Sequence, residues 1–200
     1  SRTISDHIFE VMPGVDSVER VTPSIVTLAC REARDAKLVA ISQSIALQNG
    51  LPCQLIVGPC TVDRNIDLIV RELAALGVKG IRGGCWKPRS RAYSFRGFGS
   101  HGLRWLLEAA GNYGIEAVFT EVLESHHIDI VRHIKQDVGY TGTIVLWIGA
   151  RSAGNSILHS ALGEQHDFPV MIKNGIDETG IEDWFGRIEF VLAGPMHWNS

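Results

Sequence analysis

The chain has 200 residues, 45% of them hydrophobic, and a formal net charge of −3 at pH 7. Such a chain can build one sizeable core, and its slightly acidic balance argues against a general nucleic-acid or membrane-surface binder. No apolar run approaches the roughly 18 residues that cross a bilayer, and the opening SRTISDHIFE lacks the apolar core of a signal peptide. The four cysteines show no zinc-like spacing and are too few for a disulfide scaffold, so we expect reduced thiols in a cytoplasm.

Residues 1–50 are expected to form an N-terminal extension that contains one long helix. The Thr22–Pro23 pair is a favourable helix start, because proline fits the first helical turn. From Ser24 to about Gln48 the apolar residues recur at roughly helical spacing, and Asn49–Gly50 supplies a stop signal. We therefore expect a helix over residues 24–48.

Residues 51–200 alternate between short apolar runs and helical stretches. The expected strands are 54–58, 78–82, 116–120, 143–149 and 169–173, and the expected helices are 65–77, 101–114, 126–136, 155–163 and 179–194. The apolar runs are continuous, which is typical of parallel strands buried on both faces. Successive β-then-α units of this kind predict an α/β fold with a parallel sheet.

Unusual polar and glycine-rich segments follow each expected strand. In chain order these segments are GPC, RGGCWKPRS, TEV, GARS and KNG. An open doubly wound sheet concentrates its site at one switch point, whereas a (β/α) barrel gathers residues from several strand ends. We therefore expect a TIM-type (β/α)8 barrel, of which residues 51–200 supply about five units.

Five cations lie at or just after the ends of three expected strands: Arg82, Lys87, Arg89, Arg151 and Lys173. Any one of them could be a surface charge whose aliphatic stem lies on the barrel. Together they would repel one another unless an anion lay among them, and Arg and Lys both bind phosphate and carboxylate. We therefore favour an anion site, and a substrate set with two phosphates and a carboxylate suits these charges.

Two other residues each keep two interpretations. Cys60 ends the first strand and is either a small buried thiol or a thiolate ligand for a borderline or transition metal. Glu121 directly follows the third strand, where it either pairs with a cation or positions a water molecule or proton. Cys30, Cys53 and Cys85 are expected to be small buried thiols.

Two patterns are expected to carry no site. The GFGSHG segment, Gly97–Gly102, matches a dinucleotide-binding pattern, but an arginine-rich segment precedes it where a buried apolar strand is required. His126, His127 and His133 are expected to lie on the solvated face of a helix.

Residues from about 54 to 175 resemble the 3-deoxy-D-arabino-heptulosonate 7-phosphate (DAHP) synthases through VGPCTVD, RGGCWKPRSRAYSFRGFG, TEV, IGARS and MIKNG. KPRSRAYSFRGFG is similar to the form related to 3-deoxy-octulosonate 8-phosphate synthase, whereas KNGID is closer to the other main subgroup. The resemblance implies a (β/α)8 barrel that condenses phosphoenolpyruvate with erythrose 4-phosphate in the first step of the shikimate pathway. It also implies a divalent metal (Mn, Fe, Co or Zn) and a homodimer or homotetramer, with no nucleic-acid or membrane partner.

The same resemblance assigns roles residue by residue. Cys60 would be a metal ligand, and Lys87 and Glu121 would be catalytic, with Glu121 near the water that attacks carbon 2 of phosphoenolpyruvate. The groups that would bind phosphoenolpyruvate are Arg82, Lys87, Arg151, Lys173 and the backbone of Ala150. Arg89 and Ser90 would bind the phosphate of the aldose. The sister octulosonate enzyme normally has a KANRSS-like segment, so KPRS favours the four-carbon aldose.

One departure concerns the metal site. The family's other three metal ligands are a His, a Glu and an Asp from segments beyond the KNG motif, and the sequence reaches Ser200 without them. We therefore expect these residues to be the N-terminal part of a longer product. Two alternatives stay open: a non-catalytic phosphate-binding or partner fragment, and the octulosonate synthase activity.

Overall fold

The computed structural model describes residues 11–15, 18, 38–48, 50–175 and 180–193. The chain divides after residue 35, and the strands and helices of the described residues belong to the unit that begins at residue 36. The first part of the expected helix, residues 24–37, lies outside the described residues. The division of the chain into an extension over 1–50 and a barrel over 51–200 therefore stays a prediction.

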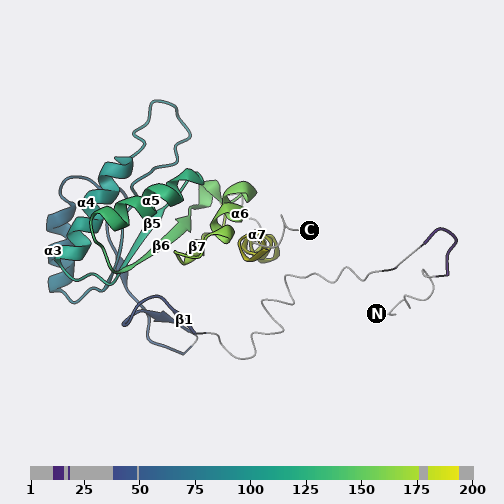
Figure 1. Cartoon of the computed structure of the whole chain (residues 1–200), viewed down its shortest axis with the longest axis horizontal. Helices are drawn as coiled ribbons and strands as arrows, with labels where there is room; N and C mark the ends of the chain where they lie inside the picture. The colour runs from purple at the N-terminus through teal and green to yellow at the C-terminus, as the bar shows by residue number, and fades with distance from the viewer. Residues whose placement is uncertain (1–10, 16–17, 19–37, 49, 176–179, 194–200) are drawn as a thin grey trace. The chain divides into compact units, whose positions relative to one another are not determined.

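A five-stranded parallel sheet forms the centre of the larger unit (Figure 1). Its strands are β3 (Ile56–Val57), β4 (Gly80–Arg82), β5 (Ala117–Glu121), β6 (Thr143–Ile148) and β7 (Val170–Ile172). They pair in sequence order, and each neighbouring pair is parallel. Each helix therefore returns the chain to the next strand along, which is the connectivity of a (β/α) barrel. The expected α/β fold with about five barrel units is confirmed.

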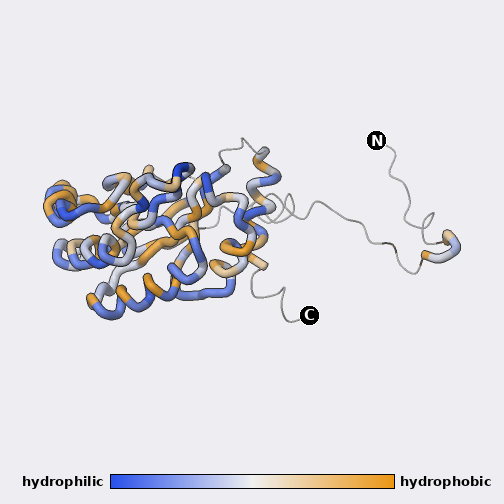
Figure 2. Tube along the Cα trace, turned by 90° about the horizontal axis from the view of Figure 1, so that it is seen from above, coloured by the Kyte–Doolittle hydropathy of each residue, from blue (hydrophilic) through white to orange (hydrophobic). Residues whose placement is uncertain are grey.

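Each strand is followed by a helix that packs on the sheet. These helices are α3 (Ile66–Ala75), α4 (Gly99–Asn112), α5 (His126–Asp137), α6 (Ser156–Glu164) and α7 (Ile181–Ala193). Figure 2 shows orange and blue residues alternating along the helices, as expected of elements with one buried face. None of the helices in the described part of the chain is long and apolar enough to cross a membrane.

Both faces of the central strands β5 and β6 are buried, which explains their continuous apolar runs. On β6, Ile144, Leu146 and Ile148 belong to the larger core beneath the helices. Val145 and Trp147, which alternate with them, belong to a smaller cluster on the opposite face. Successive strand residues point to opposite faces, so a strand between two cores needs an apolar residue at nearly every position.

A two-stranded hairpin occupies part of the segment expected to be helical. Its strands are β1 (Val39–Ala40) and β2 (Ala46–Leu47), so the prediction of a helix was wrong over residues 38–48. Ile41 and Ile45 are four residues apart, which imitates helical spacing. They instead flank a tight turn, in which Ile41 N–H donates to Ile45 O at 2.8 Å, and both side chains pack in the smaller core.

Glu116 holds this hairpin against the start of β5. Its carboxylate accepts hydrogen bonds from the Ser42 hydroxyl at 2.9 Å, the Ser44 hydroxyl at 2.8 Å and the Ser44 backbone N–H at 3.0 Å. The hydrogen bond from Ser44 is the main reason that the pKa of Glu116 lies below its usual value. The hairpin is therefore fixed at the amino end of the strands, opposite the end that carries the candidate site.

Candidate active site at the carboxyl ends of the strands

Cys60 and Lys87 meet although they follow different strands. The Lys87 ammonium donates to Cys60 O at 2.8 Å and to Cys60 Sγ at 3.2 Å. This hydrogen bond lowers the pKa of the Cys60 thiol, the charges of Lys87 and Arg82 add to the effect, and burial opposes it. Cys60 is exposed, so of its two interpretations the buried thiol is wrong, and an accessible sulfur with thiolate character remains.

Trp147, on β6, contacts two cations that come from different strands of the sheet. The Arg82 guanidinium, at the end of β4, lies 5.0 Å from the centroid of the Trp147 ring, and so does the Lys173 ammonium, which follows β7. A positive charge over an indole face is attracted by the ring quadrupole. Trp147 thus orients both cations, and its position within the apolar run 143–149 gave no sign of this role.

Glu121 lies among four of the five predicted cations. It ends β5 and is only 6% exposed, and burial raises the pKa of its carboxyl group. The positive charges of nearby side chains oppose this rise; in order of effect they are Lys87, Lys173, Arg82 and Arg151. No ion pair involving Glu121 occurs in the described part of the chain, so one carboxylate faces an excess of positive charge.

The space for Glu121 depends on a glycine at the end of β6. A Cβ atom on Gly149 would overlap Oε1 of Glu121. Directly after Gly149 the chain forms a 3₁₀-helix, Ala150–Ser152, in which Ala150 is half-buried and Arg151 exposed. The Arg151 guanidinium lies 3.5 Å from Pro88 O, which places it beside the loop that follows β4.

The loop between β4 and α4 carries the remaining predicted residues. Arg89 and Ser90 are exposed, and Arg89 Nε donates to Phe95 O at 2.8 Å. Lys87 N–H donates to Arg96 O at 2.9 Å, which closes the loop above the strand end. Gly97 follows this irregular segment, so the buried strand that a dinucleotide fingerprint requires is absent before it, as expected.

Three expectations for other residues are settled by the structure. His127 is 5% exposed and stacks on Trp86 with ring centroids 4.2 Å apart, so the prediction that it lies on a solvated face was wrong. His126 and His133 are exposed as expected. Cys85 is fully buried, and burial raises the pKa of its thiol to about 12. Cys53 is exposed, against expectation, and Cys30 lies outside the described residues.

All five strand ends therefore contribute to one region. A thiol follows β3, and β5 ends in a buried carboxyl group. Each of the other three strands, β4, β6 and β7, leads to cations. A concentration of positive charge in a partly buried region binds anions such as phosphate and carboxylate. The thiolate character of Cys60 adds a ligand of the kind that zinc and other transition metals accept.

The chain is similar to known proteins over most of its length. A family model described as "DAHP synthetase I family" matches residues 36–193. The chain is 35% identical over 185 residues to a protein of Thermotoga maritima named phospho-2-dehydro-3-deoxyheptonate aldolase, covering 92% of this chain and 51% of that protein. A crystal structure of the DAHP synthase of that organism is similar, with a TM-score of 0.69 and 30% identity, covering 97% of this chain and 52% of the other. The chain thus spans about half the length of these relatives.

Proposed function

Because the chain belongs to the DAHP synthetase I family, we propose that it supplies the substrate-binding half of an enzyme that condenses phosphoenolpyruvate with erythrose 4-phosphate. The products are DAHP and inorganic phosphate. One observation carries the proposal: the charges of four cations from three strand ends act on a single buried carboxyl group, Glu121. That surplus of positive charge suits two phosphorylated substrates.

Phosphoenolpyruvate is assigned to the cations nearest Glu121. We assign its carboxylate and phosphate to Arg82, Lys87, Arg151 and Lys173, with the backbone of Ala150. Guanidinium groups bind such anions through a planar fork, and ammonium groups contribute compact charges. The cluster would also orient the substrate, which lowers the entropic cost of bond formation.

The aldose phosphate is assigned to the exposed part of the loop after β4. Arg89 and Ser90 follow Lys87 after one proline, and the loop orients the Arg89 guanidinium through the hydrogen bond from its Nε to Phe95 O. Two substrates bound on either side of Lys87 would have their reacting carbons close together. Such proximity converts a bimolecular reaction into an effectively unimolecular one.

Cys60 fits the role of a metal ligand. Cys60 lies three residues after β3, its sulfur is accessible and the pKa of its thiol is lowered. Thiolates bind zinc and other transition metals well. A divalent metal held there would polarise the aldehyde of erythrose 4-phosphate as a Lewis acid. The identity of the metal (Mn, Fe, Co or Zn) is left to experiment.

Lys87 and Glu121 are assigned to the chemistry at phosphoenolpyruvate. Carbon 3 bonds to the aldehyde carbon, and water adds at carbon 2 before phosphate leaves by C–O cleavage. We assign Glu121 to orient this water and accept its proton; the rise in the pKa of its carboxyl group on burial supports a role in proton transfer. Lys87 would offset the negative charge of the substrate.

A phosphate-release assay tests the function. We expect phosphate from phosphoenolpyruvate only when erythrose 4-phosphate and a divalent metal are both present, and we expect Cys60→Ala to abolish this turnover. Normal turnover of Cys60→Ala in the presence of a chelator would contradict the metal assignment. Equal turnover with the five-carbon aldose arabinose 5-phosphate would favour the octulosonate reaction.

A second candidate is a phosphate-binding module without catalysis, because the cations around Glu121 can bind an anion whether or not a reaction follows. Calorimetric titration with phosphoenolpyruvate beside the phosphate assay distinguishes the two candidates. Binding without turnover supports the module, and binding with turnover supports the enzyme. For either candidate we propose a cytoplasmic homo-oligomer.

A further inference from the structure

Trp86, directly before Lys87, anchors the start of the loop after β4. Its side chain is half-buried and packs against the larger core, whereas residues 89–93 of the same loop are all exposed. A Cβ atom on Gly99, at the beginning of α4, would lie 3.4 Å from the Trp86 indole nitrogen, so the indole packs directly on that helix. Trp86 therefore fixes the buried part of the loop from which Lys87 projects.

The indole of Trp86 stacks on the ring of His127, at the start of α5. The two ring centroids lie 4.2 Å apart, the ring planes differ by 18°, and His127 is only 5% exposed. Nδ1 of His127 accepts a hydrogen bond from the Leu123 backbone N–H at 3.2 Å. Leu123 lies two residues beyond Glu121, the end of β5. The His127 ring thus contacts the segments that follow two different strands, β4 and β5.

The protonation state of His127 suits both contacts. Burial lowers the pKa of His127 to about 4, and the charge of His126 adds to the effect. At neutral pH the ring is therefore uncharged, with its proton on Nε2 and a lone pair on Nδ1 that can accept from Leu123. The ring consequently stacks on Trp86 without burying a charge.

We propose that His127 is a positioning residue for Lys87, which it holds in place through its stack on Trp86. The Lys87 ammonium donates to the Cys60 carbonyl at 2.8 Å and to the Cys60 sulfur at 3.2 Å, so a small shift of the loop would break these contacts. Binding groups keep such geometry when side chains behind them are locked by packing. The role in the reaction rests on the function proposed above, in which Lys87 binds phosphoenolpyruvate, whereas the position of Lys87 is measurable without turnover.

The rate at which iodoacetamide alkylates Cys60 reports on the position of Lys87. The hydrogen bond from Lys87 favours the thiolate, which is the form that reacts. A chelator keeps metal off the sulfur, and mass spectrometry of the Cys60 peptide separates this site from Cys53, which is also exposed. Lys87→Met sets the reference and should slow the reaction about tenfold or more, the loss of a hydrogen bond from a charged group.

Two substitutions of His127 isolate the stack, because both remove the acceptor for Leu123 N–H and only one removes the flat ring. His127→Leu should slow the alkylation of Cys60 about three- to tenfold, which corresponds to one weakened hydrogen bond. His127→Phe keeps a ring over Trp86 and should restore most of the wild-type rate.

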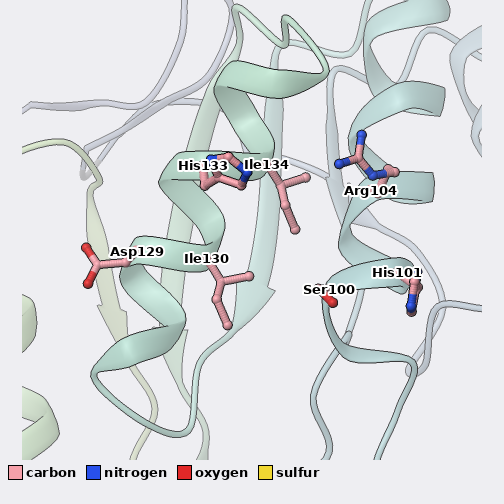
Figure 3. A pocket seen from close by; sticks show the side chains of 7 residues that line it. All are labelled: Ser100, His101, Arg104, Asp129, Ile130, His133 and Ile134. Atoms are coloured by element: carbon pink, nitrogen blue, oxygen red, sulfur yellow. The ribbon is translucent and has the colours of Figure 1, made fainter.

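His133→Ala is the matched control on the same helix. His133 is exposed and lines a groove between α4 and α5 with His101 and Arg104 (Figure 3), so its loss should leave the rate unchanged. Cys85 is fully buried, so its alkylation in the same samples marks an unfolded variant. If His127→Leu fails this check, Trp86→Leu takes its place, because it removes the same stack from the side of the loop.

Three results would each overturn the proposal. These are a wild-type rate in His127→Leu, an equally slow rate in His127→Phe, and a wild-type rate in Lys87→Met. Slowing by His133→Ala would also contradict it, because that residue does not contribute to the stack. The alkylation requires no turnover, so failure of the proposed enzyme activity leaves its result intact.

Discussion

Single residues determine the geometry of the candidate site. Lys87 connects two strand ends by donating to the Cys60 carbonyl and sulfur. It is 9% exposed, so its ammonium lies in a region of reduced dielectric where such contacts are stronger than in water. Gly149 has an equally local role, because the Glu121 carboxylate occupies the space that any larger residue would need.

Gly149→Ala should reduce turnover while leaving the fold intact. The added Cβ would overlap Oε1 of Glu121, and the flexible carboxylate can move away, but it would then leave its place among the cations. We expect kcat to fall about 100-fold, the lower end of what a positioned general base contributes, because the carboxylate is displaced and not removed. Steady-state assays of phosphate release measure this change.

Gly154→Ala is the control for this substitution. A Cβ atom at Gly154 would meet nothing within 4 Å, so turnover should stay at the wild-type level. If Gly149→Ala and Gly154→Ala have the same kcat, the assignment of Glu121 to the chemistry fails.

At the scale of elements, the contact between α6 and α7 encloses a histidine. His159, on α6, is fully buried, and among the residues that the structure describes neither of its ring nitrogens has a hydrogen-bond partner. Gly163, one turn later, lies directly against the backbone of Val191 on α7, so the two helices approach closely. Burial lowers the pKa of His159, and the charge of Arg187 adds to the effect.

This histidine should make stability depend on pH. Its pKa in the folded state lies below its value of about 6.5 in the unfolded chain, so between the two values only the unfolded state binds the proton. Stability should therefore be greatest above pH ~6.5 and fall as the pH decreases. Urea unfolding at several pH values measures the slope of the free energy of unfolding against pH.

His159→Leu should flatten that slope below pH ~6.5 and raise stability at neutral pH. Removing a buried polar group without partners gains about 1–3 kcal/mol. His127 is also buried with a lowered pKa and contributes in the same direction in both proteins, so the difference between them isolates His159. Parallel slopes for wild type and His159→Leu would contradict this account.

At the scale of the whole molecule, the repeating pattern of the fold was predictable from the sequence. Parallel strands buried on both faces need continuous apolar runs, so each expected strand overlaps an observed one. The hairpin was not predictable, because Ile41 and Ile45 imitate helical spacing while packing around a turn. Local periodicity does not distinguish these cases, since the difference lies in contacts with Glu116, more than 70 residues away in sequence.

The candidate site was predictable to a similar extent. Residues at strand ends share one edge of a parallel sheet, which allowed Cys60, Lys87 and Glu121 to be grouped from sequence. The roles of Trp147 and His127 depend on which partner each ring meets, Arg82 and Lys173 in one case and Trp86 in the other. Such pairings arise from tertiary packing and leave no periodic signal.

The central claim is that cations from different strands bind one phosphoenolpyruvate, and calorimetric titration with this compound tests it most directly. Arg82→Met and Lys173→Met should each weaken binding about 10–100-fold, the equivalent of a lost charge-assisted hydrogen bond, because these side chains approach the same Trp147 ring from β4 and β7. Arg71→Met, which removes an exposed cation on α3, should bind like the wild type. The same affinity in all four proteins, or no binding by the wild type, would contradict the account.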